Sequence, residues 1–180
     1  MKITRRFAAL ALTLAMLTCT LTGCKSTITS MARKIIGTSD EVQEEDTTRW
    51  AESTDDQLNI EGISDASAKY ASARVSTRLN VVFNGIWSRK TDYFTAPNGS
   101  ITITAYGTAD GTQKFKVAVW RKIDGGAEYV DGSTYYFKTD GQNYRCVVSG
   151  LDPSSSYRLT ISYDSSKYYL SGALQVEGVG

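Results

Sequence analysis

The sequence contains no histidine. Without histidine, a chain cannot build the Ser-His-Asp or Cys-His arrangements of many hydrolases, and it lacks the commonest metal ligand in proteins. No Ser stands three residues before a Lys, and neither a P-loop nor a dinucleotide-binding glycine pattern is present. These absences predict that the protein is not an enzyme and that it holds no cofactor or metal.

The sequence also lacks an apolar run long enough to span a bilayer, which takes about 20 residues. Its longest uncharged apolar stretch covers residues 7–21 and follows the basic residues Lys2, Arg5 and Arg6. A short apolar run behind positive charges is typical of a secretory signal peptide. We therefore expect an export signal at the N-terminus and no transmembrane helix after it.

The apolar run ends in Leu21, Thr22, Gly23 and Cys24. A leucine, two small residues and a cysteine at this place resemble the lipobox of bacterial lipoproteins. The resemblance implies that a signal peptide of residues 1–23 is removed and that Cys24 is lipidated with a diacylglyceryl group. Two or more acyl chains anchor a protein stably. The expected location is therefore extracytoplasmic, on a membrane of the bacterial cell envelope.

The mature chain has a small net charge and little cysteine. Removing the three basic residues of the signal peptide leaves 20 − 3 = 17 basic residues against 19 acidic ones, a net charge of −2. No basic stripe indicates a nucleic-acid partner. Cys19 leaves with the signal peptide and Cys24 is expected to be lipidated, so Cys146 alone remains and an intramolecular disulfide is excluded.

Residues 24–78 are rich in acidic residues, Ser and Thr. A stretch of this composition buries little apolar surface, so it predicts a mostly disordered tether between the lipid and a folded domain. Within it, residues 66–74 have the pattern of a short helix. Trp50 stands out as an aromatic residue that either packs locally or marks a short interaction segment.

Residues 79–180 carry strand-like runs separated by Asn-Gly and Asp-Gly pairs, the first of which is Asn84-Gly85. These pairs favour tight turns, and their spacing without a helical period predicts an all-β domain. Apolar and polar residues alternate in about seven runs, as in antiparallel strands with one buried face. The sequence thus predicts a single antiparallel β-sandwich, with residues 85–97 long enough to hold an extra strand. The alternating apolar positions are Leu79, Val81, Phe83, Ile101, Ile103, Ala105, Phe115, Val117, Val119, Tyr144, Cys146, Val148, Tyr157, Leu159, Ile161, Tyr163, Leu174 and Val176, with a further strand at residues 135–137.

The segment Gly150 to Ile161 carries Leu151, Pro153 and Tyr157, followed by alternating apolar residues. This spacing resembles the tyrosine corner of fibronectin type III and related immunoglobulin-like sandwiches. The resemblance implies that the leucine plugs one end of the sandwich and that the tyrosine hydroxyl bonds to upstream backbone. The second strand lacks the core tryptophan usual in that family, so a jelly roll, as in many carbohydrate-binding modules, is the alternative fold.

A binding surface is expected where side chains point away from the core. On the run from residue 114 to 122, Trp120 alternates with the buried set, which predicts an exposed indole on a flat sheet. Lys114, Lys116 and Lys122 share its face and favour an anionic or polyhydroxylated partner. Tyr168 and Tyr169 lie in the last loop, where aromatic residues often contact ligands.

Three functions fit these observations. The first is a membrane-anchored binding or adhesion module that contacts a protein or an envelope polysaccharide. The second is a carbohydrate-binding lipoprotein that uses exposed aromatic side chains. The third is a structural accessory subunit of an envelope complex.

Overall fold

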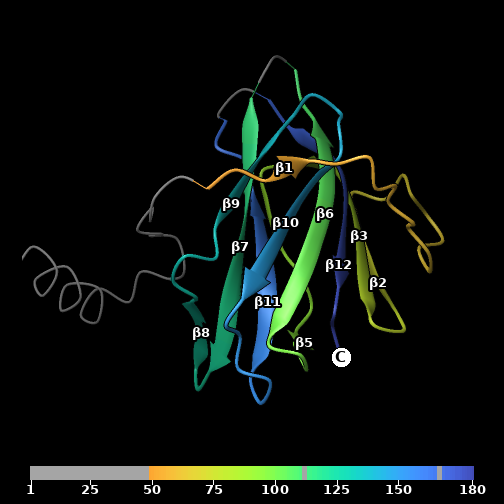
Figure 1. Cartoon of the computed structure of the whole chain (residues 1–180). Coiled ribbons are helices and arrows are strands. Elements are labelled where there is room, and N and C mark those ends of the chain that lie inside the picture. Colours follow the sequence, from red (N-terminus) through yellow and green to blue (C-terminus); the bar gives the residue numbers. More distant parts are fainter. Residues whose placement is uncertain (1–48, 111–112, 166–167) are drawn as a thin grey trace, which may run out of the picture. The chain divides into compact units, whose positions relative to one another are not determined.

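The computed structural model describes residues 49–110, 113–165 and 168–180. These residues form two antiparallel β-sheets and contain no helix (Figure 1), which confirms the predicted all-β antiparallel sandwich. The expected signal peptide, Cys24 and the first half of the expected tether lie outside the described residues. The strands are β1 (Glu52–Ser53), β2 (Tyr70–Val75), β3 (Arg78–Ile86), β4 (Ser88–Lys90), β5 (Phe94–Thr95), β6 (Ser100–Thr108), β7 (Lys114–Ile123), β8 (Gly126–Tyr129), β9 (Tyr135–Lys138), β10 (Tyr144–Ser149), β11 (Ser156–Ser162) and β12 (Leu170–Glu177).

Within the described residues, each sheet has six strands. The β6 sheet runs in the order β1-β10-β6-β12-β3-β2. The β7 sheet runs in the order β4-β11-β7-β8, with β5 also paired to β11 and β9 also paired to β7. From β3 onward most connections cross from one sheet to the other, so β11 and β12, neighbours in sequence, lie in different sheets.

Seven of the strands coincide with the seven predicted alternating runs: β3, β6, β7, β9, β10, β11 and β12. Their predicted inward residues are buried in one hydrophobic core between the sheets. The other five strands have two to six residues, too few or too irregular to show an alternation in sequence. Two of these, β4 and β5, lie in residues 85–97, where an extra strand was predicted.

The sequence predicts a tight turn at the Asn84-Gly85 pair, but the pair forms a bulge inside β3. Gly172 of β12 pairs with Phe83 of β3, and Leu170 of β12 pairs with Ile86 of β3. The step between these pairs is two residues in β12 but three in β3, so β3 carries one extra residue here. Gly85 has a φ of 63°, and its amide donates a hydrogen bond to the Ser171 hydroxyl. A positive φ suits a bulge as well as a tight turn, because both need a left-handed residue.

The predicted domain start at Leu79 is wrong. Residues 70–75 form β2, which pairs with β3 along its length, and no helix occurs at residues 66–74. Residues 49–53 bridge the two sheets: Ala51 donates to the Tyr136 carbonyl of β9, and β1 pairs with β10. The described part of the expected tether therefore belongs to the sandwich.

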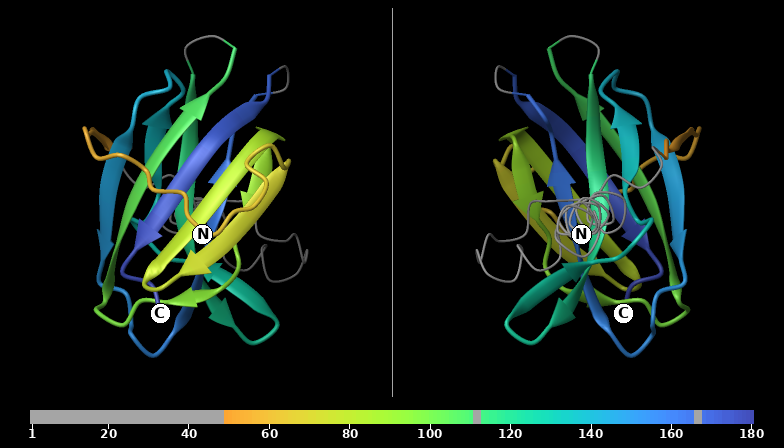
Figure 2. Two further views of the ribbon diagram at one scale, coloured as in Figure 1. Left: turned by 90° about the vertical axis from the view of Figure 1, so that its right-hand side faces the viewer. Right: turned by 90° about the vertical axis from the view of Figure 1, so that its left-hand side faces the viewer.

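Residues 54–62, called the strap below, cross the outer face of the β6 sheet (Figure 2, left). Pairing aligns Arg145, Thr104, Gln175 and Asn80 in one row across four strands of that face. The strap bonds to three members of this row. Asp56 pairs with Arg145 at 2.8 Å, the Asn59 carbonyl accepts from Gln175, and the Glu61 carbonyl accepts from Asn80.

The way in which the strap is attached explains why its composition predicts disorder although it is ordered. It has few apolar side chains to bury, and its attachment depends mainly on hydrogen bonds between its backbone carbonyls and buried amide side chains. Asn80 and Gln175 are both buried and bond to each other at 3.0 Å. Buried amides need partners, and the strap supplies them.

Candidate functional site

Two large aromatic side chains form an exposed pair at one edge of the sandwich. Trp87 and Tyr169 are about half exposed, and their rings stack with centroids 5.0 Å apart and an interplanar angle of 15°. The Trp87 indole also donates a hydrogen bond to the Tyr168 carbonyl at 3.1 Å. We call Trp87 and Tyr169 the aromatic platform.

Strand pairing positions this platform. Ile86 of β3 and Leu170 of β12 are paired and fully buried. One residue beyond this pair, Trp87 and Tyr169 face each other, and alternation turns their side chains away from the core. The bulge at Gly85 sets the register of this pair, so it also sets where the platform lies.

A hollow of about 350 Å³ adjoins the platform. Among the described residues, its lining includes Lys69 and Arg89 as charged residues and no carboxylate, and the other lining residues are Gly85, Ile86, Trp87, Ser88 and Tyr169. Arg89 donates to the Ser88 carbonyl at 2.9 Å, which holds the guanidinium at the rim. The surface can thus stack a ring or a CH-rich face and offer cations to polar groups beside it.

Sequence reasoning identified half of the platform. Tyr169 was predicted as a loop contact residue and is exposed, whereas Tyr168 is half-buried and packs against the core. The sequence assigns Trp87 to the long connection of residues 85–97 and does not indicate that it binds a ligand. The missing signal was the pairing of Ile86 with Leu170, which the sequence alone does not reveal.

The predicted exposure of Trp120 is wrong. Alternation does turn its side chain away from the core, and it lies outside the core cluster, but only 6% of the residue is accessible. The edge of the Tyr129 ring packs against the Trp120 ring, with centroids 5.8 Å apart. Arg158 of β11 lies opposite Trp120 in the strand register. The indole is buried on the outer side of the sheet, so it offers no ring face for stacking.

The three predicted lysines lie on the same strand as Trp120 but serve local contacts. Lys114 lies 4.1 Å from the centroid of the Tyr136 ring, and Lys122 lies 5.4 Å from that of Tyr93. Lys116 pairs with Asp164 at 3.3 Å. They share one face, as predicted, but they do not surround an exposed indole.

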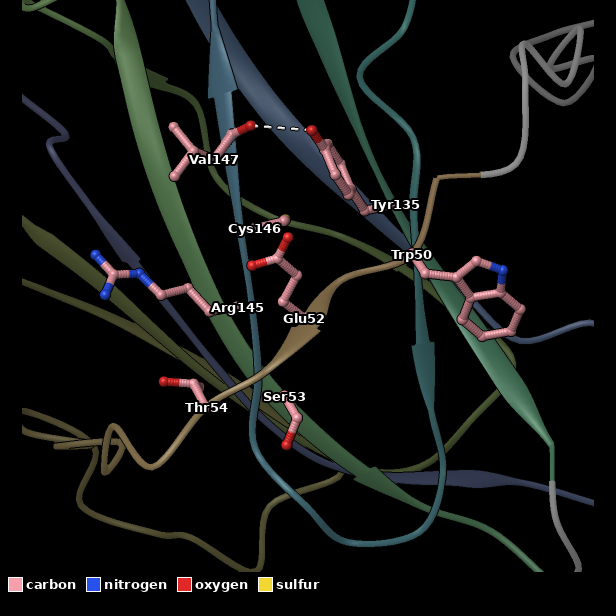
Figure 3. A pocket seen from close by; sticks show the side chains of 8 residues that line it. All are labelled: Trp50, Glu52, Ser53, Thr54, Tyr135, Arg145, Cys146 and Val147. Atoms are coloured by element: carbon pink, nitrogen blue, oxygen red, sulfur yellow. Dashed lines mark hydrogen bonds between the residues drawn. The ribbon is translucent and has the colours of Figure 1, made fainter.

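A second hollow, of about 530 Å³, lies where residues 50–54 cross from the β7 sheet to the β6 sheet (Figure 3). The Tyr135 hydroxyl donates to the Val147 carbonyl at one end of it, and the Trp50 ring points away from the other side chains. Cys146 borders this hollow but is buried, and burial raises the pKa of its thiol to about 12. A thiol with so high a pKa is a poor nucleophile at neutral pH.

The corner residues have structural contacts. The Tyr157 hydroxyl accepts a hydrogen bond from the Asp152 amide at 2.7 Å and donates to the Asp152 carbonyl at 3.1 Å. Leu151 is buried at the end of the core, while Pro153 is exposed in the turn. These bonds are those expected of a tyrosine that closes a corner.

Within the described ranges, no three His, Cys, Asp or Glu side chains gather as metal ligands would. The same ranges contain no helix long and apolar enough to cross a membrane. No protein-family model matches the chain, and the search of curated proteins found no similar sequence.

Proposed function

We propose that this protein is an exported lipoprotein that displays a β-sandwich binding module on a bacterial membrane. The signal-like N-terminus ending at Cys24 supports the anchor. The aromatic platform is the observation that supports binding, because stacked, half-exposed aromatic rings beside a hollow are unusual on a surface without a partner.

An envelope polysaccharide is the ligand class that suits this platform best. Sugar rings present flat CH faces that pack against aromatic rings, and their hydroxyls accept hydrogen bonds from Lys69 and Arg89 at the rim. A protein partner, in an adhesion or accessory role, is the competing class.

The strand order supports the jelly-roll alternative over the fibronectin type III arrangement. In immunoglobulin-like sandwiches the strand that carries the corner tyrosine and the strand after it lie in the same sheet. Here β11 carries Tyr157, and β12 lies in the other sheet. Double-sheet jelly rolls are common in lectin domains, which agrees with a glycan ligand.

Retention of the unacylated chain on insoluble envelope material tests the proposal. Trp87→Ala and Tyr169→Ala should each weaken retention at least tenfold, which corresponds to about 1.4 kcal/mol. Trp50→Ala is the matched control, because Trp50 is equally exposed but lies elsewhere. Equal retention of all variants would exclude the platform as the contact surface, and retention on envelope protein alone would favour the competing class.

A further inference from the structure

The outward face of the β7 sheet is positively charged. Alternation places six basic side chains there, because Phe115, Val117, Val119, Phe137, Leu159 and Ile161 occupy the core. One of these cations, Lys116, is ion-paired with Asp164. The six basic residues are Lys90, Lys114, Lys116, Lys122, Lys138 and Arg158. We call them the basic face.

The opposite side of the sandwich is acidic. The β1 strand, the strap and the turn after it bring five carboxylates to the outer side of the β6 sheet. Arg78 and Arg145 also lie on that side, so the domain carries an excess of positive charge on one outer face and an excess of negative charge on the other. An anionic surface would attract the first and repel the second, which orients the whole domain. The five acidic residues are Glu52, Asp55, Asp56, Glu61 and Asp65.

The chain enters the sandwich beside the basic face. The Arg49 carbonyl accepts from the Tyr136 amide of β9, and the Trp50 ring packs on the Tyr136 ring, 5.7 Å between centroids. Residues 24 to 48, which is 25 residues, separate the lipid-bearing cysteine from this point. Fully extended, 25 residues span at most about 90 Å, so an anchored domain samples the membrane surface at high effective concentration.

We propose that the basic face docks on anionic lipid headgroups of the membrane that holds the anchor. This proposal rests on the proposed lipid anchor but not on the aromatic platform. Docking turns the strap side towards the surrounding medium. Lysine side chains suit headgroups, because each is a flexible point charge that does not require a fixed geometry in its partner.

Vesicle sedimentation tests the docking without the anchor. The unacylated chain from residue 25 keeps the whole core, which lies between Ala51 and Val179. It should bind vesicles containing phosphatidylglycerol and not pure phosphatidylcholine, and 0.5 M salt should abolish binding. Replacing the exposed residues Lys114, Lys122 and Lys138 with Gln should weaken binding at least tenfold, because each basic residue near an anionic membrane contributes roughly fivefold.

A charge-matched control removes Arg74, Arg78 and Arg145, three cations of the β6 sheet, by the same change to Gln. This variant should bind within twofold of the parent chain. Equal loss in the two variants, or no preference for phosphatidylglycerol, would overturn the proposal. Binding to soluble polyphosphate but not to vesicles would do so as well, and would assign the face to a soluble polyanion. Because no lipid is attached, failure here leaves the test of Cys24 unaffected.

Discussion

At the scale of single residues, the Leu151–Tyr157 corner stabilises one end of the sandwich. Tyr157→Phe keeps the buried ring and removes a hydroxyl that makes two hydrogen bonds, so we expect a loss of about 1 kcal/mol. Leu151→Ala opens a cavity at a packed end and should cost roughly 2–5 kcal/mol. Urea unfolding measures both. A Leu151→Ala midpoint equal to that of the parent chain would contradict the assignment, and Pro153→Ala, at an exposed position, is the control.

Trp120 is expected to be a stability residue. Because it is buried under Tyr129 on the outer side of β7, Trp120→Ala should cost about 3 kcal/mol or more. A surface substitution would change stability by no more than about 0.5 kcal/mol. Thermal unfolding and iodide quenching together check this prediction. An unchanged melting temperature with a fully quenched indole would mean that Trp120 is exposed after all.

At the scale of the element, the strap and β2 make residues 49–78 part of the folding unit. We expect the chain 79–180 to be insoluble or to unfold without cooperativity, because it exposes the β3 edge and removes the partners of Asn80 and Gln175. The chain 25–180 is the control and should unfold cooperatively. Proton dispersion in NMR spectra distinguishes these outcomes, and a well-dispersed spectrum of 79–180 would show that the strap is dispensable.

The long strands were predictable because period-two alternation is strong wherever one face of a strand is buried. The inward residues of β3, β6, β7, β10 and β11 follow directly from it. The strap was not predictable, because its attachment relies on backbone carbonyls, which every sequence has. Trp120 shows a related limit: alternation predicts the direction of a side chain, whereas its exposure depends on neighbours such as Tyr129.

The aromatic platform was only partly predictable from the sequence. Tyr169 was identifiable as a loop aromatic, but Trp87 acquires its role through the register of β3 against β12. That register includes a bulge at Gly85, and the Asn-Gly pair there is equally typical of a turn. A sequence pattern does not distinguish the two, because both need the same backbone conformation at glycine.

At the scale of the whole molecule, the proposal joins a lipid anchor to a binding module. Cys24→Ser should abolish metabolic labelling with palmitate and shift the protein from the membrane to the soluble fraction, because the lipid is its expected attachment. Cys146→Ser, which leaves Cys24 in place, is the control and should keep the label. Unchanged labelling of Cys24→Ser would refute the anchor.

The most direct test of binding uses the indole N–H signals of Trp50, Trp87 and Trp120 in the ¹⁵N-labelled chain. Trp50 and Trp87 report two exposed surfaces and Trp120 reports a buried position, so one titration with soluble fragments of envelope polysaccharide compares all three. The account predicts that the Trp87 signal shifts and saturates while the Trp120 signal stays in place. A titration in which Trp87 does not move while another indole signal does, or in which none moves, would contradict it.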